Sequence, residues 1–427
     1  MLLQFSVGNY RSFKDPVTFS TVTADLPEKS KKLNKNNVIS ISNSLSLLKS
    51  CAIYGANASG KSNLIEALSF MRRFVLRSAI GYQVTDQIDV EKFRLNNETK
   101  EDPSYFEINV LLKGKEFRYG FEVDAHKVHA EWLYHVPRVR ESKLFIREDG
   151  EFSLSNVFKE GKGLTNKTRD NALLLSVVAQ FNGEISQSIL KWFGRLSIVY
   201  GLQYLKYRDY TVEKIQNENF KNDVLSLVRE MDLGISDLQV EKSDPASIKY
   251  DNFGLEQNGK QPARITTIHK NYAADVSKNN EKIPVSWEYF DFDKNESEGT
   301  KKIFSLAGPI IDALRNGKTL IIDELDARLH PLVTSYIIEL FNSKTSNPHD
   351  AQLIFTTHNT NLLSDKLFRR DQIWFTEKDK YGASSLYSLA EYQVRHDAPF
   401  EKDYISGRYG AIPFMGSTHR LVGATNA

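Results

Sequence analysis

The residues best suited to chemistry lie between positions 55 and 63. They read, in order, Gly55-Ala56-Asn57-Ala58-Ser59-Gly60-Lys61-Ser62-Asn63. The first eight fit Gly-x4-Gly-Lys-Ser, a loop whose backbone N–H groups cradle nucleotide phosphates. Lys61 is expected to reach the β- and γ-phosphates and Ser62 to bind Mg²⁺. We place Lys61 on a solvent-facing loop.

The residues around this loop support the interpretation. An apolar stretch at 52–54 leads in, and a helix-forming stretch at 64–68 leads out. That order points the positive end of the helix at the phosphates. The alternative, a Gly-rich turn before a purely structural helix, fits this order poorly.

Two acids follow a second apolar stretch, which reads Leu320-Ile321-Ile322-Asp323-Glu324. The carboxyl ends of strands are where ligands lie in open α/β sheets. Asp323 is expected to hold Mg²⁺, directly or through water, and Glu324 to polarise the attacking water as a general base. The alternative is an ordinary strand exit with two acids, which the upstream phosphate loop disfavours.

Two further candidate sites are less specific by themselves and are supported mainly by their position in the chain relative to these motifs. The stretch Ser297-Glu298-Gly299-Thr300 precedes a predicted helix. Taken alone, Ser297 is better interpreted as a helix N-cap, although a glycine there also allows close approach to a phosphate. His358 ends a predicted strand, where a lone histidine is more often structural. It is nevertheless expected at the same sheet end as the two acids, where it can donate a hydrogen bond to a γ-phosphate.

The elements that must position these residues alternate between strands and helices. Apolar stretches predict strands at 318–322 and 353–355, with a helix at 332–341 that has Pro331 in its first turn. Two buried strands separated by a helix indicate a parallel sheet and an α/β fold. A helical stretch from 297 toward Leu314 contains Pro309, which is expected to break or kink it.

The middle of the chain is less regular. The opening residues alternate like a strand from Leu3 onward, and the stretches 106–112 and 117–123 predict a hairpin. More strand signal follows at 132–134 and 143–146. We interpret 170–235 as mostly helical and the polar stretch 241–264 as loop.

Bulk properties exclude several classes. The chain has 427 residues, which is long for one ordinary core, and a net charge of +2, which gives no global basic field. Its one cysteine, Cys51, fits a reducing cytosol and a small core position. No stretch reaches ~18 consecutive apolar residues, and the N-terminus lacks the features of a signal peptide. We therefore expect a cytoplasmic protein.

The order of these motifs resembles that of the ABC-class ATPases. Within that class, the motifs are most similar to those of the SMC and RecF-like branch. The opening Asn9-Tyr10-Arg11-Ser12-Phe13 resembles the first strand and turn of that branch. Within it, the chain is similar to stand-alone bacterial ATPases related to the overcoming-lysogenization-defect (OLD) proteins, many of which belong to antiphage defence pairs. The stretch 403–414 adds to this likeness.

The resemblance implies a P-loop ABC-ATPase head with a mixed sheet. Residues 1–75 and 290–427 would form the core, and 76–289 a large α/β insertion, β-rich and then helical. It further implies ATP and Mg²⁺ as cofactors, Asp326 as the D-loop residue, and a homodimer or higher homo-oligomer. In that assembly Ser297, Gly299 and Thr300 of one head would face Lys61 and Ser62 of the other, and hydrolysis would act as a switch.

Departures from the family narrow the function. No long coiled coil is present, and no nuclease metal cluster is identifiable after His358, so a nuclease or toxin activity is expected in a separate effector protein. The main alternative is a RecF-like repair ATPase that binds DNA, which leaves nucleic acid as a possible partner. A transporter subunit fits less well because of the insertion, and a GTPase would need an Asn-Lys-x-Asp motif. No Gln marks a Q-loop near 93–95.

Overall fold

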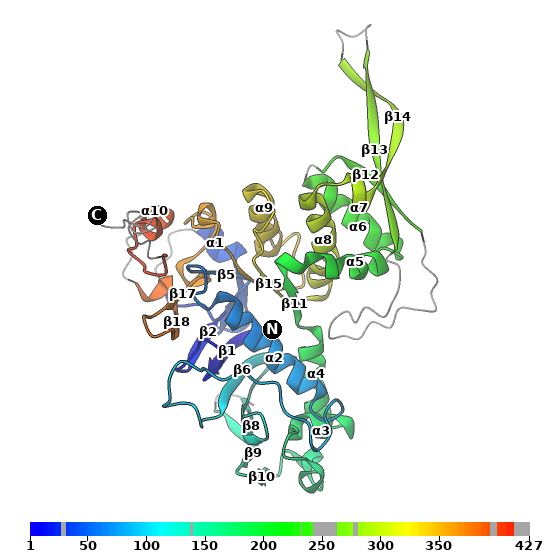
Figure 1. The fold of residues 1–427 in the computed structure, drawn as a ribbon. Helices are drawn as coiled ribbons and strands as arrows, with labels where there is room; N and C mark the ends of the chain where they lie inside the picture. Colours follow the sequence, from blue (N-terminus) through cyan, green and yellow to red (C-terminus); the bar gives the residue numbers. More distant parts are fainter. Residues whose placement is uncertain are drawn as a thin grey trace, which may run out of the picture.

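The computed structural model describes residues 1–26, 31–136, 140–231, 233–241, 263–275, 281–392 and 399–413. Two large sheets organise most of this chain, and a third, smaller sheet projects away from them (Figure 1). The fold is mixed α/β, as predicted. None of the described helices has the length and apolar character needed to cross a bilayer.

The central sheet has six strands in the order β11-β15-β16-β5-β17-β18. All neighbours are parallel except β17 and β18. Its strands are β5 (Ser50–Tyr54), β11 (Ser197–Tyr200), β15 (Thr319–Asp323), β16 (Gln352–Thr356), β17 (Ile373–Lys378) and β18 (Ser384–Ser388). The predicted parallel pairing of the strands at 318–322 and 353–355 is confirmed.

Alternating side chains of the central sheet enter two different cores. Cys51 and Ile53 of β5 pack into one core, whereas Ala52 and Tyr54 pack into the other. Strands buried on both faces read as continuous apolar stretches, which is why these strands were detectable in the sequence. Cys51 is buried, as expected of a small core residue.

The second sheet is antiparallel throughout, with seven strands in the order β10-β9-β8-β7-β6-β1-β2. These strands are β1 (Leu2–Gly8), β2 (Val17–Ser20), β6 (Ser104–Leu112), β7 (Lys115–Val123), β8 (Val128–Val136), β9 (Ser142–Glu148) and β10 (Glu151–Leu154). The predicted hairpin is confirmed as β6–β7. Because β1 pairs directly with β6, the β-rich part of the predicted insertion continues a sheet that the N-terminus begins.

Helices cover both cores. Helix α2 (Lys61–Arg77), α3 (Leu174–Gln180) and α4 (Glu184–Arg195) contribute to the first core, and α6 (Glu218–Glu230), α8 (Glu298–Asn316) and α9 (Pro331–Asn342) to the second. The shorter helices are α1 (Lys31–Asn36), α5 (Arg208–Lys214), α7 (Phe292–Asn295) and α10 (Phe400–Ile405). Strands β3 (Val38–Ser40) and β4 (Ser46–Leu48) form a separate two-stranded hairpin.

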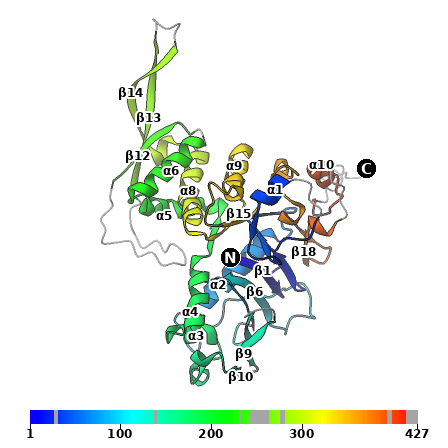
Figure 2. The ribbon, with the colours of Figure 1, turned by 180° about the vertical axis from the view of Figure 1, so that it is seen from behind.

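The third sheet consists of β12 (Ile235–Glu241), β13 (Arg264–Asp275) and β14 (Glu281–Asp291). The prediction of a β-rich and then helical insertion omits these strands, and it also omits β11 within the stretch assigned as helical. The predicted loop at 241–264 lies largely outside the described residues, but its two ends belong to β12 and β13. From the base, β13 and β14 project as a long ribbon (Figures 1 and 2).

Of the predicted break or kink at Pro309, the break does not occur. Helix α8 is continuous from Glu298 to Asn316. A proline lacks the N–H that would bond the carbonyl four residues earlier, here that of Ser305. The hydroxyl of Thr211 on α5 donates to this carbonyl instead, at 3.0 Å. A side chain of the neighbouring helix α5 thus provides the hydrogen bond that the carbonyl of Ser305 would lose to the proline.

Candidate nucleotide-binding site

The Gly-x4-Gly-Lys-Ser loop joins β5 to α2, as the sequence predicts. Gly55 and Gly60 have φ of +154° and +119°, which side chains rarely allow. A Cβ on Gly55 would also lie 2.4 Å from the carbonyl oxygen of Thr376, and one on Gly60 would lie 2.6 Å from Oγ of Ser384. The two glycines therefore allow the loop to pack directly against β17 and β18.

Hydrogen bonds from residues outside the phosphate loop hold this loop in place. Oγ of Ser59 lies 2.6 Å from Oγ1 of Thr376, and the hydroxyl of Ser384 donates to the carbonyl of Ser59 at 2.7 Å. Nδ2 of Asn63 donates to Oγ of Ser12 at 2.7 Å. Sequence reasoning missed Thr376 and Ser384, because nothing near them in the chain marks strands that pack on the loop.

Lys61 is the first residue of α2 and is only 5% exposed. The expectation of a solvent-facing position is therefore wrong. Its Nζ donates to the carbonyls of Gly55 and Ala56 at 2.8 and 2.9 Å. Burial lowers the pKa of Lys61 to about 8, although the negative charges of Asp323, Glu324 and Asp326 oppose this shift. The loop curls around its own lysine, so the amine is enclosed at the position where the motif presents it to a phosphate.

The two acids after β15 differ in environment. Asp323 is buried, and the hydroxyl of Thr356 donates to its Oδ1 at 2.6 Å. The same hydroxyl accepts the backbone N–H of Glu324 at 2.7 Å. Glu324 has a left-handed φ of +52°, which turns the chain sharply after the strand. Burial raises the pKa of Glu324, and the nearby Asp323 and Asp326 raise it further. A carboxylate with a raised pKa binds a proton more readily, as a general base must.

Asp326 and His358 lie at the same end of the sheet. The backbone N–H of His358 donates to Oδ2 of Asp326 at 3.3 Å. The other oxygen, Oδ1, is buried without a hydrogen-bond partner among the described residues. Burial, and then the positive charge of Lys61, lower the pKa of His358. A neutral imidazole keeps one N–H that a phosphate oxygen can accept.

The oxygen atoms at this end fit Mg²⁺. The Ser62 side chain is exposed in the first turn of α2, and Asp323 supplies a carboxylate at the end of β15. Mg²⁺ typically binds one or two carboxylates and keeps its other positions for waters and substrate phosphates. Among the described residues, no group of three or more His, Cys, Asp or Glu side chains could hold a metal by itself. The residues therefore suit a metal that arrives with a nucleotide.

The Ser-x-Gly stretch begins α8. Ser297 is the N-cap, and its Oγ accepts the backbone N–H of Thr300 at 3.1 Å. The hydroxyls of Ser297 and Thr300 also lie 2.9 Å apart. Within the described part of the chain, these two side chains hydrogen-bond to each other and not to the phosphate loop. The structure therefore does not bring Ser297, Gly299 and Thr300 together with Lys61 inside one chain.

One buried lysine links this helix to the loop after Asp323. Nζ of Lys302 donates to the carbonyls of Glu324, Leu325 and Ala327 at 3.2, 3.1 and 2.6 Å. Burial lowers its pKa to about 8. Sequence reasoning did not identify Lys302, although this residue lies in the second turn of α8, shortly after the Ser-x-Gly stretch. The contacts tie the start of α8 to the loop around Asp326.

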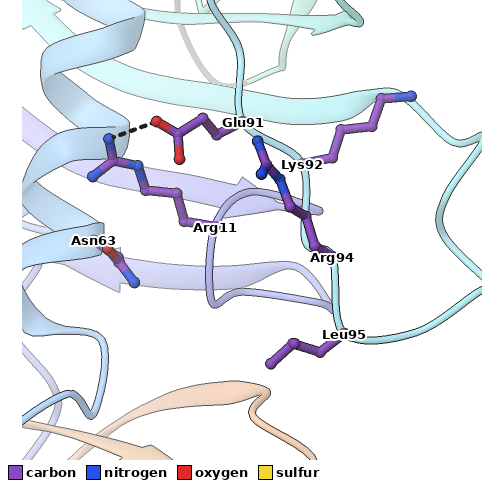
Figure 3. Close-up of a pocket in the computed structure, with 6 residues that line it drawn as sticks. All are labelled: Arg11, Asn63, Glu91, Lys92, Arg94 and Leu95. Atoms are coloured by element: carbon purple, nitrogen blue, oxygen red, sulfur yellow. Dashed lines mark hydrogen bonds and ion pairs between the residues drawn. The ribbon is translucent and has the colours of Figure 1, made fainter.

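A cavity of about 430 Å³ opens beside α2 (Figure 3). Its lining consists of Arg11, Asn63, Glu91, Lys92, Arg94 and Leu95. Arg11 pairs with Glu91 at 3.1 Å. The lining thus carries three cationic side chains and one acidic side chain. Sequence reasoning named Arg11 in the opening turn, Asn63 with the phosphate loop, and Arg94 and Leu95 in the stretch without a Q-loop glutamine. It did not single out Glu91 or Lys92.

Comparisons with known proteins agree with this geometry at a coarse level. A family described as "AAA domain, putative AbiEii toxin, Type IV TA system" matches residues 51–364, which is well over half of the chain. That range contains the phosphate loop, both acids and His358. No curated protein matches the chain.

Two solved structures illustrate what the fold is similar to. One is an SMC head bound to the C-terminal winged-helix domain of ScpA, with 13% identity, a TM-score of 0.45, and coverage of 91% of this chain and 97% of the other. The second is an SMC head domain from Thermotoga maritima, with 13% identity, a TM-score of 0.41, and coverage of 91% and 98%. At these values the likeness concerns the path of the chain and not its function.

Proposed function

We propose that this chain, which belongs to the AAA-domain family of P-loop ATPases described above, hydrolyses ATP. We further propose that it uses the reaction as a dimerisation switch. The observation that carries the proposal is the meeting of Lys61, Asp323, Glu324, Asp326 and His358 at one end of the central sheet. Burial shifts the pKa values of Lys61, Glu324 and His358, and charges of the same group act on each of the three.

Each residue has a proposed role in hydrolysis. Backbone N–H groups of residues 55–63 and the amine of Lys61 bind the phosphates. Ser62 and Asp323 hold Mg²⁺, which neutralises phosphate charge when it is bound. Glu324 takes a proton from the attacking water. The hydroxyl of Thr356 positions both acids, because it bonds the backbone N–H of Glu324 and the carboxylate of Asp323. His358 donates a hydrogen bond to the γ-phosphate.

The switch requires a second copy of the chain. Ser297, Gly299 and Thr300 begin a helix whose N-terminus is suited to a phosphate, but their described hydrogen bonds do not lead to their own phosphate loop. We propose that they bind the γ-phosphate held by the partner, next to the partner's own phosphate loop. Hydrolysis then removes the group that joins the two copies.

The name of the family supports a role in bacterial defence, since it refers to a putative toxin of a type IV toxin–antitoxin system. We propose that this chain is the sensor or switch of such a system and that a separate nuclease or toxin is the effector. Purifying the native chain with its bound proteins and identifying them by mass spectrometry will show whether such an effector accompanies it.

Glu324→Gln is the decisive variant for the ATPase. The amide keeps the size of the side chain but cannot accept the proton, so we expect ATP hydrolysis to fall by roughly a hundredfold or more. ATP binding should persist, and the variant should accumulate as an ATP-bound dimer in size-exclusion chromatography with light scattering. Full turnover in Glu324→Gln would refute the assignment of the base.

A second substitution separates dimerisation from binding. Ser297→Arg in the Glu324→Gln background places a bulky cation at the start of α8, so ATP should still bind but the dimer should not form. Lys301→Ala in the same background is the matched control, because it alters a neighbouring cation of α8 beyond the three proposed contacts. A dimer that forms equally well with Ser297→Arg would contradict the arrangement in trans.

A further inference from the structure

The ribbon formed by β13 and β14 reaches far from the rest of the molecule (Figures 1 and 2). Strand β12 pairs with only the first half of β13, from Arg264 to His269. Beyond that point the ribbon carries large apolar side chains that are unusually exposed: Tyr272 at 51%, Val285 at 54% and Trp287 at 51%. Tyr289, which lies opposite Ile268, is 59% exposed. Aromatic residues exposed on a projecting element are more typical of an interaction surface than of a structural one.

The register of the ribbon gathers three of these aromatic residues on one face. Lys270 pairs with Trp287, Ile268 with Tyr289, and Tyr272 with Pro284. Paired residues share a face, and so do residues two positions apart on a strand. The face therefore carries Tyr272, Trp287 and Tyr289 together with Lys270 and Lys282, and we call it the aromatic face.

The charges on the two faces of the ribbon differ in sign. On the aromatic face between Ile268 and Tyr289, the charged side chains that the structure describes are Lys270 and Lys282, and neither forms an ion pair with a described residue. The carboxylate of Glu288 lies on the opposite face, where it accepts a hydrogen bond from Asn271 at 3.2 Å. An acidic partner can thus approach the aromatic face without meeting a like charge.

We propose that the aromatic face binds single-stranded nucleic acid. Unpaired bases stack on aromatic rings whatever their sequence, while lysines attract the phosphates. Side chains two positions apart on a strand are separated by about 6.8 Å, which is roughly two stacking distances of 3.4 Å. Trp287 and Tyr289 are therefore spaced so that one base fits between their rings. A protein interface would also favour the aromatic residues, but it would not favour Lys270 and Lys282, because lysine is depleted at buried protein interfaces.

The base of the ribbon connects this surface to the proposed ATP site. Oγ1 of Thr267 lies 2.5 Å from Oε1 of Glu296, and Nε2 of His269 lies 2.8 Å from the same oxygen. Glu296 directly precedes Ser297, the N-cap of α8. A strand of nucleic acid that shifts the ribbon would thus act on the residue next to the proposed signature. The binding proposal itself does not depend on ATP hydrolysis and is tested without ATP.

The test uses the full chain and fluorescence anisotropy of labelled 30-mers of dT and of U at low salt. The double variant Trp287→Ala/Tyr289→Ala should weaken binding by roughly 5- to 100-fold, because the one base placed between the two rings loses its stacking. Phe181→Ala and Tyr381→Ala remove exposed aromatic residues elsewhere on the molecule and should leave binding unchanged. A duplex of the same length should bind more weakly, since its bases are not free to stack.

Salt dependence tests the lysines separately. Replacing both Lys270 and Lys282 with Gln should reduce the slope of log K against log[salt] by about 1.4, from about 0.7 for each lost phosphate contact with a single strand. Circular dichroism of every variant should match the wild type, because all of these side chains are exposed. No binding by the wild-type chain, equal binding by the double variant, or tighter binding of the duplex would each overturn the proposal. A preference for U over dT would instead identify the strand as RNA.

Discussion

At the scale of single residues, Lys61 shows how strongly its surroundings determine its chemistry. The loop that presents it also encloses it, so that its amine is buried against two carbonyls. Burial costs the ammonium its hydration, and the three nearby carboxylates restore only part of that loss. The lysine that the motif provides as a fixed positive charge is thus able to lose its proton near pH 8.

The pH dependence of ATP binding follows from this pKa of about 8. Phosphate binding needs the protonated amine, so the apparent Kd for ATP should rise above pH 8, approaching about tenfold per pH unit. Calorimetric titration between pH 7 and 9.5 measures this directly. In Lys61→Arg the guanidinium stays charged, so the affinity for ATP should vary little over this pH range. A flat profile in the wild type would contradict the lowered pKa.

The stability of the protein should rise with pH over the range in which its affinity for ATP falls. Between about pH 8 and the usual lysine pKa near 10.5, Lys61 holds fewer protons in the folded protein than in the unfolded chain. Its contribution to the free energy of unfolding therefore increases as pH rises through this range. Lys302, whose pKa is also about 8, contributes with the same sign.

At the scale of elements, the contact between α5 and α8 compensates for the proline inside helix α8. Thr211 donates to the carbonyl of Ser305 and accepts the backbone N–H of Gly308 at 3.1 Å. A Cβ on Gly308 would lie 2.4 Å from Oγ1 and 2.9 Å from Cα of Thr211. The absence of a side chain at 308 therefore allows the close approach through which Thr211 compensates for Pro309.

Gly308→Ala should consequently destabilise the protein by about 1–3 kcal/mol, as expected when a methyl group is forced into a filled contact. Urea unfolding followed by circular dichroism measures the change. Gly194→Ala is the matched control, because Gly194 also lies in a helix, α4, but a Cβ there would meet nothing within 4 Å. That substitution should be neutral or stabilising by about 0.5–1 kcal/mol. Equal effects of the two substitutions would contradict the packing argument.

At the scale of the whole molecule, the central sheet separates two cores and gathers the chemical groups at one of its ends. The phosphate loop follows β5, the two acids follow β15, and His358 follows β16, all of which are parallel neighbours or next neighbours in the sheet. The ribbon of β13 and β14 projects from the side of the molecule where α8 lies (Figure 1). The proposed recognition and the proposed hydrolysis would thus use different elements of one chain.

This separation predicts that the chain is a switch and not the effector. With ATP and Mg²⁺, the purified chain should leave DNA and RNA oligonucleotides intact on denaturing gels, because the described residues contain no metal-binding cluster suited to a nuclease. It should still bind single strands through the aromatic face. Robust cleavage by the chain that is lost in Glu324→Gln or Asp323→Asn would overturn this division of roles.

The sequence alone determined the parts of the site that local patterns encode. Buried parallel strands are contiguous apolar stretches, and the turns that follow them need particular residues, so the phosphate loop, Asp323, Glu324 and the strand before His358 were all recognisable. The N-cap at Ser297 was equally local, because the side chain bonds a backbone N–H three residues away. The roles of these residues in catalysis remain predictions.

The tertiary structure decided what depends on residues far apart in the chain. The burial of Lys61, the contacts of Thr376 and Ser384 with the loop, and the continuity of α8 through Pro309 all come from elements packed against one another. Strand β11 was missed because four residues carry too little periodicity to separate a strand from a helix. The ribbon went unrecognised although residues 285–289 alternate between apolar and polar side chains, which is the pattern of a strand.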